Sequence, residues 1–462
     1  MADQLTPEQR TLKRVIDDHE KDLTPLRLFD RYYEGTQPLS YMHPDLQREL
    51  EDRLRQVVVN WPRLVIDSVE ERLDVEGFRY PDVDDADDEL QRVWQANNLD
   101  EWSQQGHVDA MVMKRAYTVV SHNDADEATP LVSVESPLEM HAELDPATRL
   151  PRNAVKRWKQ PAEDAGGKLV EMATLYTQAG LRVPFSKKDG TWEQTGDPVD
   201  TKFGRLPVSL LPNRPRLLIP MGTSDLADIT SLSDAACKIA TDMMVAAEFA
   251  AIGQRWVFGM KPEDFKDPKT GQQLSTWQAV LGRVWAHENS EAKAGTFPAA
   301  DLKNFHDTLN ALARMVASIA GLPVTEMGFV TDNPPSADAI RASEIRRIKR
   351  AERKQRPFGG GWENTMRLVR LAQLGQEDVK ASRLETIWRD PSTPTVAQKA
   401  DAAVKLNVAG ITPLRQTRED LGYSVTQIER MEQQDLEEDP LQRLGRTPPP
   451  NEPPQPNQPP AA

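Results

Sequence analysis

The sequence contains one cysteine, few aromatic residues and no long uncharged apolar run. A single thiol cannot close a disulfide within the chain, so Cys237 is expected to be a small buried side chain in a protein assembled in a reducing cytoplasm. Residues 1–18 lack the basic-then-apolar order of a secretion signal. Charged residues interrupt the alanine-rich stretch around residue 240, so no membrane-spanning segment is predicted.

Local motifs for catalysis are also missing. Gly167-Lys168 is followed by Leu169 and lacks the upstream glycine of a phosphate-binding loop. The histidines are scattered, and the acidic run Asp82–Glu89 lacks the central glycine and closing glutamate of a calcium loop. We therefore predict no cofactor, no metal site and no catalytic residues, and expect that the chain is not an enzyme.

Length and composition limit the possible number of structural units and the fold class. With 462 residues the chain exceeds what one hydrophobic core usually serves, so two or more structural units are expected. Aromatic residues make up 6% and charged residues 28% of the chain, a mixture typical of an extended, mainly helical α+β protein whose surface is completed by neighbours. A soluble acidic enzyme would have the same totals.

Two stretches carry apolar residues at steps of three and four, the spacing of one face of a helix. The first, Asp228–Ile252, has a face made mostly of alanine, which suits close packing of helix on helix. The second begins at the capping residue Asp301 and ends at Gly321. The face positions are Leu232, Ala236, Ile239, Met243, Ala247 and Ala250 in the first helix, and Leu302, Phe305, Leu309, Leu312, Val316 and Ile319 in the second. A polar line that is predicted to be solvated comprises Lys303, Asp307, Asn310 and Arg314.

Two ordinary amphipathic core helices remain the alternative to a special role for this pair. Between them, residues 253–300 carry turn signals around two strand-like runs, Arg255–Gly259 and Arg283–His287, which predicts a small strand-rich insert. After the second helix, Leu322–Pro335 has no helical pattern, and its closing prolines favour an extended or turned backbone. It is predicted to be a loop presented by two helices, with a plain surface connection as the alternative.

A basic helix is predicted from Ala337 to Arg356, in a chain whose net charge is −15. Its cations are Arg341, Arg346, Arg347, Lys349, Arg350, Arg353, Lys354 and Arg356. This local reversal of charge requires an anionic partner, and phosphates or acidic patches of a neighbouring subunit fit it equally well. The Gly359-Gly360-Gly361 run is predicted to bend or break the helix.

The flanking regions differ in their periodicity. Thr6–Gln9 opens a helix, and a second helical piece precedes Gly35. Residues 117–211 open with a hairpin and show strand periodicity, which predicts a β meander inserted in a helical protein. Three short helices are expected over residues 395–438, and from Pro440 onward prolines and amides predict a disordered tail.

The order of helix, small insert, helix, proline-rich loop and long basic helix resembles the stem, clip, second stem helix, tunnel loop and wing helix of tailed-bacteriophage portal proteins. The likeness is strongest to the portal family of siphophages of Gram-positive and actinobacterial hosts. It covers residues 5–435, most specifically 225–372, and is carried by Asp242–Phe249, Gln254–Trp256, Phe297–Leu302 and Ser336–Arg341. These sequence segments do not form a catalytic motif, so their value is as markers of the family.

The resemblance implies a portal-type fold with wing, stem, clip and crown regions that assembles as a ring. The implied regions are a wing (1–221), a first stem helix (222–252), a clip (253–300), a second stem helix (301–321), a tunnel loop (322–335), a long basic wing helix (336–374), a crown-like helical region (375–438) and a disordered tail (439–462). The implied tunnel-loop residues facing the DNA channel are Glu326, Gly328, Val330, Thr331, Asp332 and Asn333. The implied clip residues contacting a motor or adaptor are Lys261, Glu263, Asp264, Lys266 and Asp267.

A portal protein of this family is expected to be a virion component at the unique capsid vertex, in a ring usually of twelve copies. Double-stranded DNA would pass through the ring during packaging and ejection. Implied partners are the terminase packaging motor, the major capsid and scaffolding proteins, and a head-completion or adaptor protein that joins head to tail. Assembly is expected in the host cytoplasm without a membrane.

Two alternatives come from the residues alone. One is a cytoplasmic nucleic-acid-binding regulator that uses residues 341–356 directly on a duplex. The other is a nuclease or transferase with a dispersed site, since catalytic groups can assemble across long sequence distances. Neither alternative explains the order of helix, insert and helix.

Overall fold

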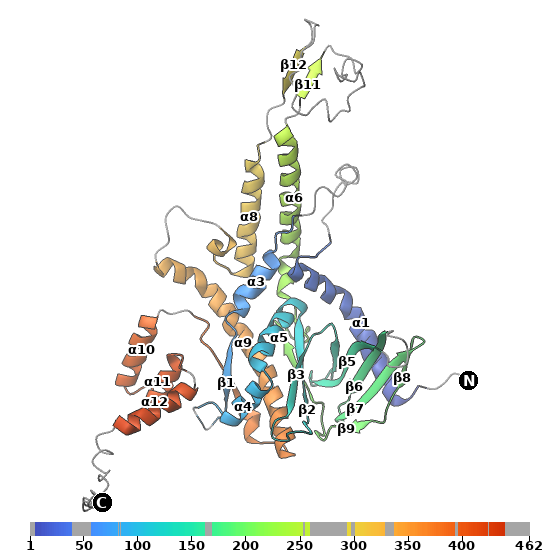
Figure 1. Ribbon diagram of the computed structural model, residues 1–462, viewed down its shortest axis with the longest axis vertical. Helices are drawn as coiled ribbons and strands as arrows, with labels where there is room; N and C mark the ends of the chain where they lie inside the picture. The colour runs from blue at the N-terminus through green and yellow to red at the C-terminus, as the bar shows by residue number, and fades with distance from the viewer. Residues whose placement is uncertain are drawn as a thin grey trace, which may run out of the picture. The chain divides into compact units, whose positions relative to one another are not determined.

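The computed structural model divides the chain into two compact units, Met1–Pro391 and Ser392–Ala462, in line with the expectation from length (Figure 1). Both helices and sheets are present, so the chain is α+β, as predicted. The structure describes residues 5–38, 57–81, 83, 85–161, 169–252, 255–258, 293–296, 301–328, 337–392, 396–423 and 425–438.

The main core of the first unit is shared by α3 (Trp61–Glu70), α4 (Asp88–Ala96), α5 (Leu99–Met113) and α9 (Ala337–Leu374). Trp94 of α4 and Trp362 of α9 are buried there, and their rings meet edge to face with centroids 5.0 Å apart. The Trp362 indole N–H donates to Nε2 of His107 at 2.9 Å. The one polar atom of this large side chain is therefore satisfied inside the core.

Helix α1 (Pro7–Glu34) opens with a reciprocal capping box between Thr6 and Gln9, as predicted. The prediction of two helical pieces is wrong, because α1 continues past Pro25 as one helix. Leu26, the next residue, is fully buried. Packing on the core therefore holds the helix together across a residue that alone would favour a break.

Three antiparallel sheets of the described residues pack with or beside these helices in the first unit. One sheet has the strand order β4–β5–β6–β7–β8 with β9 beside β7, a second has the order β10–β2–β3, and β1 pairs with β13. The strands are β1 (Val75–Arg79), β2 (Arg115–Ser121), β3 (Leu131–Glu135), β4 (Met140–Leu144), β5 (Pro151–Pro161), β6 (Leu169–Tyr176), β7 (Leu181–Lys188), β8 (Thr191–Gln194), β9 (Val199–Asp200), β10 (Val208–Pro212) and β13 (Glu385–Trp388).

The predicted hairpin is confirmed as β2–β3, but the prediction of a single meander is wrong. Strand β10 returns to pair with β2, with Leu210 opposite Tyr117, so the region splits into two sheets. Helix α1 lies on the larger sheet, where Val15 packs in one cluster with Val155 and Phe185 (Figure 1). Alternation along a strand predicts which side chains are buried, but it does not predict which strands pair.

Helix α9 runs through Gly359-Gly360-Gly361 as one helix, so the predicted break does not occur. The reason is its close packing on β10. A Cβ atom at Gly361 would lie 2.5 Å from the Leu211 side chain and 2.6 Å from the carbonyl oxygen of Leu210. Glycine is therefore needed for the approach of helix to sheet, and burial there offsets its poor helix propensity.

We expect Gly361→Ala to lower the free energy of unfolding by about 1–3 kcal/mol, because its methyl group overpacks against β10. Gly360→Ala is the matched control, since nothing lies within 4 Å of a Cβ atom at that position. There the substitution should raise stability by about 0.5–1 kcal/mol through helix propensity alone. Urea denaturation followed by circular dichroism measures both, and equal effects would contradict this account of the glycine run.

The second unit contains α10 (Val396–Val408), α11 (Leu414–Asp420) and α12 (Val425–Glu438), close to the three short helices predicted. Arg415 and Glu432 form an ion pair at 3.2 Å between α11 and α12. The predicted crown-like region begins at residue 375, within the first compact unit. Residues up to Pro391 belong to the first unit, because β13 pairs with β1 more than 300 residues earlier, a contact that leaves no local pattern.

Candidate functional site

Two helices, α6 (Thr230–Ile252) and α8 (Lys303–Ala320), lie side by side (Figure 1). A short 3-10 helix, η1 (Asp225–Asp228), precedes α6, so α6 begins at Thr230 and not at the predicted Asp228. Asp301 accepts a hydrogen bond from the N–H of Lys303 at 2.9 Å, but α8 begins at Lys303 with Leu302 as its N-cap, so the predicted start at Asp301 is wrong. Gly321, with a φ of 70°, ends α8 as predicted.

Small side chains are buried on both helices. They include Ala236 and Cys237 of α6, and Ala313 and Ala317 of α8. Small residues permit close approach of helices, and Cys237 has the buried position predicted for it. Despite its alanine content, neither α6 nor any other helix in the described ranges is long and apolar enough to cross a membrane.

Larger apolar side chains of the pair stay open to solvent. Met244 is 45% exposed, Met315 52% and Ile319 39%. Among the predicted face positions, Ala236 and Val316 are buried, whereas Leu232, Ile239, Met243, Ala247, Leu302, Phe305, Leu309 and Leu312 are half-buried. The side chain of Ala250 lies outside the described residues. The chain alone therefore covers only part of the apolar surface of this pair.

The predicted polar line along α8 is exposed throughout. It comprises Lys303, Asp307, Asn310 and Arg314. Helix α8 thus has a solvated face and an apolar face that is half-covered, the arrangement of a helix with one side toward water and another toward a packing partner.

The insert between α6 and α8 contains a two-stranded antiparallel sheet. The predicted strand at Arg255 is β11 (Arg255–Phe258), and its partner is β12 (Lys293–Thr296), a strand that sequence reasoning missed. The other predicted strand, Arg283–His287, lies outside the described residues. So do the predicted contact residues Lys261, Glu263, Asp264, Lys266 and Asp267.

The loop after α8 begins with a 3-10 helix, η3 (Val324–Met327), where the sequence predicts no helix. Gly328, with a φ of 85°, ends it in a left-handed conformation that suits glycine. Glu326 of η3 forms an ion pair with Arg347 of α9, so the first turn of the loop is tied to the basic helix. Residues 330–333 lie outside the described residues.

The inward cations Arg347 and Arg350 bind this same segment. Arg347, whose side chain is 7% exposed, also pairs with Glu344 at 2.9 Å. Arg350 donates to the carbonyl oxygen of Ile319 at 2.5 Å, near the C-terminal end of α8, where the helix dipole favours a cation. Both arginines therefore fasten α9 to the chain segment that precedes it.

Lys354 is the most deeply buried cation of α9. Its ammonium donates to the carboxylate of Asp225 in η1 and, at 2.6 Å, to Oδ1 of Asn213. Burial opposes ionisation of Asp225, but contact with Lys354 and the nearby Arg214 lower its pKa below the usual range, so it remains a carboxylate. This pair locks α9 to the segment from which α6 starts.

The other cations of α9 face outward. Arg346, Lys349, Arg353 and Arg356 are exposed. Lys349 pairs with Glu352 at 2.7 Å, whereas the three arginines form no ion pair within the described part of the chain. The side chain of Arg341 lies outside that part. The prediction that the whole basic helix needs an external anion is therefore wrong for Arg347, Arg350 and Lys354, whose acceptors lie within the chain.

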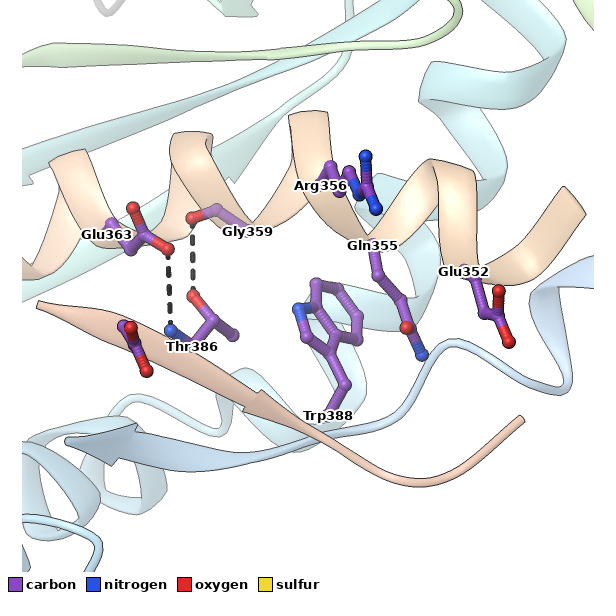
Figure 2. A pocket seen from close by; sticks show the side chains of 8 residues that line it. Glu352, Gln355, Arg356, Gly359, Glu363, Thr386 and Trp388 are labelled. Carbon is purple, nitrogen blue, oxygen red and sulfur yellow. Dashed lines mark hydrogen bonds between the residues drawn. The ribbon is translucent and has the colours of Figure 1, made fainter. Parts of the chain in front are cut away.

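A surface hollow of about 400 Å³ lies between α9 and β13 (Figure 2). Thr386 fixes its floor by donating its backbone N–H to Glu363 at 3.4 Å and its hydroxyl to the carbonyl oxygen of Gly359 at 3.2 Å. Burial raises the pKa of Glu363, and Trp388 forms one wall. Across the described ranges no group of His, Cys, Asp and Glu could hold a metal.

Comparison with known proteins decides the family. Residues 12–440 match the family described as phage portal protein, SPP1 Gp6-like. The chain belongs to this family. The portal protein of Mycobacterium phage D29 is 44% identical over 392 residues, which cover 82% of this chain and 79% of the relative. The portal protein of Mycobacterium phage L5 is 41% identical over 435 residues, which cover 92% and 87%.

Solved structures are more distant. The chain is similar to a chain in the virion of a native gene transfer agent particle, with 14% identity and a TM-score of 0.43, over 83% of this chain and 95% of that one. A chain from the neck of the empty particle, computed with C6 symmetry, gives 14% identity and a TM-score of 0.44 over the same shares. The sequence relatives confirm the predicted portal family and portal function.

In this portal family member, the residues that hold the buried cations of α9 could not be recognised from the sequence. Asp225 lies 129 positions before Lys354, and Asn213 lies 141 positions before it. Glu326 was predicted as a channel residue, whereas the structure gives its carboxylate to Arg347. Long-range pairing of this kind becomes visible only when the chain is folded.

We expect Lys354→Met to lower the free energy of unfolding by about 3–5 kcal/mol, because it removes the buried counter-ion of Asp225 and leaves this carboxylate only the partly exposed Arg214, 3.5 Å away. Arg353→Met, on the outward face, is the control and should change stability by no more than about 0.5 kcal/mol. Adding Asp225→Leu to Lys354→Met should recover most of the loss, since the orphaned charge is then gone. Chemical denaturation measures all three variants. Similar losses of unfolding free energy for Lys354→Met and Arg353→Met would show that the Lys354–Asp225 pair does not hold α9 in place.

Proposed function

We propose that the chain is one subunit of a closed ring at the unique vertex of a phage capsid, and that double-stranded DNA passes through this ring during packaging and ejection. Membership of the portal family supports the proposal. The structural observation that carries it is the apolar surface left open along α6 and α8.

Met244, Met315 and Ile319 are exposed on helices whose other apolar positions are largely half-buried. A neighbouring copy packed on this pair would remove apolar area from water, at about 25 cal/mol for each Å². When the two surfaces that meet are different, the contact repeats head to tail and can close into a ring. Twelve copies is the number that the family resemblance implies.

The regions follow from this proposal. The α6 and α8 pair forms the stem, and the insert at 253–300 forms the clip that meets the terminase motor and later a head-completion or adaptor protein. Residues 1–221 and α9 form the wing, toward the major capsid and scaffolding proteins. The three helices of the second unit form the crown. Assembly takes place in the host cytoplasm.

The loop at 322–335 forms the narrowest part of the channel in this proposal. Its first turn is held by the ion pair of Glu326 with Arg347, and its second end leads directly into α9. Because Arg347 offsets Glu326, the loop carries less free negative charge than its sequence predicts, and Asp332 supplies what remains. A weakly charged constriction contacts a moving duplex without gripping its phosphates.

Purified protein is expected to form rings with a central hole at micromolar concentration. Met315→Asp should reduce the ring fraction, because it puts a charge into the apolar surface that a neighbour must cover. Asn310→Asp adds the same charge on the solvated face of α8 and should assemble like the parent. Mass photometry and negative-stain imaging measure both, and a parent protein that stays monomeric would contradict the ring.

Deletion of Val330–Asn333 should leave ring assembly and capsid incorporation near normal and impair DNA packaging or retention, because these residues lie in the proposed constriction. A same-length Gly-Ser-Gly-Ser replacement separates loop length from side-chain identity. Nuclease-protected DNA per particle, counted by quantitative PCR, is the measurement. If the deletion variant retains DNA as the parent does, the loop is a plain connector.

A further inference from the structure

The outward face of α9 carries four cations, the basic stripe: Arg346, Lys349, Arg353 and Arg356. They recur at steps of three and four residues over about 15 Å of helix. They lie opposite the inward face, where Arg347, Lys354 and Phe358 are buried. In the described part of the chain only Lys349 of the four has an ion pair, so three guanidinium groups are left for another surface.

The composition of the basic stripe favours a protein partner over DNA phosphates. Three of its four cations are arginines, which suit carboxylates and phosphates alike. Ile345, beside Arg346, decides between them. It is 55% exposed, and an apolar side chain gains from burial against protein but not from a phosphate backbone.

A second surface of the same chain has the opposite sign. Asp67 and Glu70 of α3 and the C-cap residue Glu71 lie on the side away from the buried Val65 and Val69; we call them the acidic face. No lysine or arginine within the described ranges forms an ion pair with any of these three carboxylates. Asp67 accepts a hydrogen bond from the hydroxyl of Tyr33 at 2.9 Å, but the three neighbouring carboxylates still repel one another.

The acidic face borders a hollow of about 500 Å³, lined by Asp67 and Glu71 among others. The two cations in its wall already have partners: Arg63 pairs with Glu34 at 2.8 Å, and Arg347 with the loop carboxylate. Burial together with the adjacent carboxylates raises the pKa of Glu70 to about 7. Burial is the larger cause, so Glu70 is partly protonated at neutral pH, and a cation brought beside it would favour its ionised form.

We propose that the basic stripe of one subunit docks on the acidic face of the next subunit, with its arginines reaching the hollow beside α3. This inference rests on the proposed function, since it names a contact that closes the ring. Stripe and face are different surfaces of one chain, so the contact is head to tail. Paired arginines and carboxylates fix the register and orientation of neighbours more than they add affinity.

Two charge-reversal variants test the docking. The stripe variant combines Arg346→Glu with Arg353→Glu, and the face variant combines Glu70→Arg with Glu71→Arg. Each alone should raise the protomer concentration needed for ring formation by about tenfold or more, a loss of about 1.4 kcal/mol per contact. Lys188→Glu with Lys405→Glu, which changes the charge as the stripe variant does at exposed lysines elsewhere, should assemble like the parent.

Equal amounts of the two variants, mixed, should recover assembly to within roughly threefold of the parent. In the mixture the acidic stripe of one variant meets the basic face of the other, and the basic stripe of the second meets the acidic face of the first. The two alternate around the ring. Mass photometry counts the rings, and circular dichroism melting confirms that each variant is folded.

The outcomes separate the two proposals. A parent that forms no rings overturns both. Normal rings from the parent and from both variants overturn the docking and leave the ring intact. Loss in each variant without recovery in the mixture also overturns the docking, because each surface then contacts something else. A stripe variant that forms rings but loses affinity for a short DNA duplex, by fluorescence anisotropy, assigns the stripe to phosphates instead.

Discussion

The first unit depends on the buried ion pair between Lys354 and Asp225. It joins the middle of α9 to η1, the segment from which α6 starts, at a place from which water is excluded. On one side of this pair Arg347 holds the beginning of the loop; on the other, Gly361 lets the helix lie against β10. A buried ion pair adds little net stability but penalises any other arrangement strongly, so it fixes how these elements meet.

Features that depend on near neighbours in the sequence could be predicted. The capping box at Thr6, the end of α8 at Gly321 and the burial of Cys237 follow from side chains a few positions apart, and the structure confirms them. Features that depend on distant residues could not. The glycine run was expected to break α9 because its propensity is poor, and the contact with Leu211 that overrides propensity lies 150 positions earlier.

The same distinction applies to the candidate site. Counting charges along α9 correctly located a basic helix, but it treated all its cations alike. In the folded chain these cations form two groups. Lys354 and its inward neighbours bind acceptors within the chain, whereas Arg353 and its outward neighbours lie at the surface. A helix of this kind serves two purposes at once, because opposite faces are only a few residues apart in sequence.

The continuity of α9 has a mechanical consequence. The helix spans 38 residues, a length of about 57 Å, and continues as one helix through Pro357 and the glycine run. One end follows the loop that Arg347 fastens, and farther along it lies against β10 and β13. A displacement of the loop is therefore passed along α9 toward the sheets. Pro357 lacks a backbone N–H and so removes one hydrogen bond of the helix, which makes it the position at which α9 yields most readily.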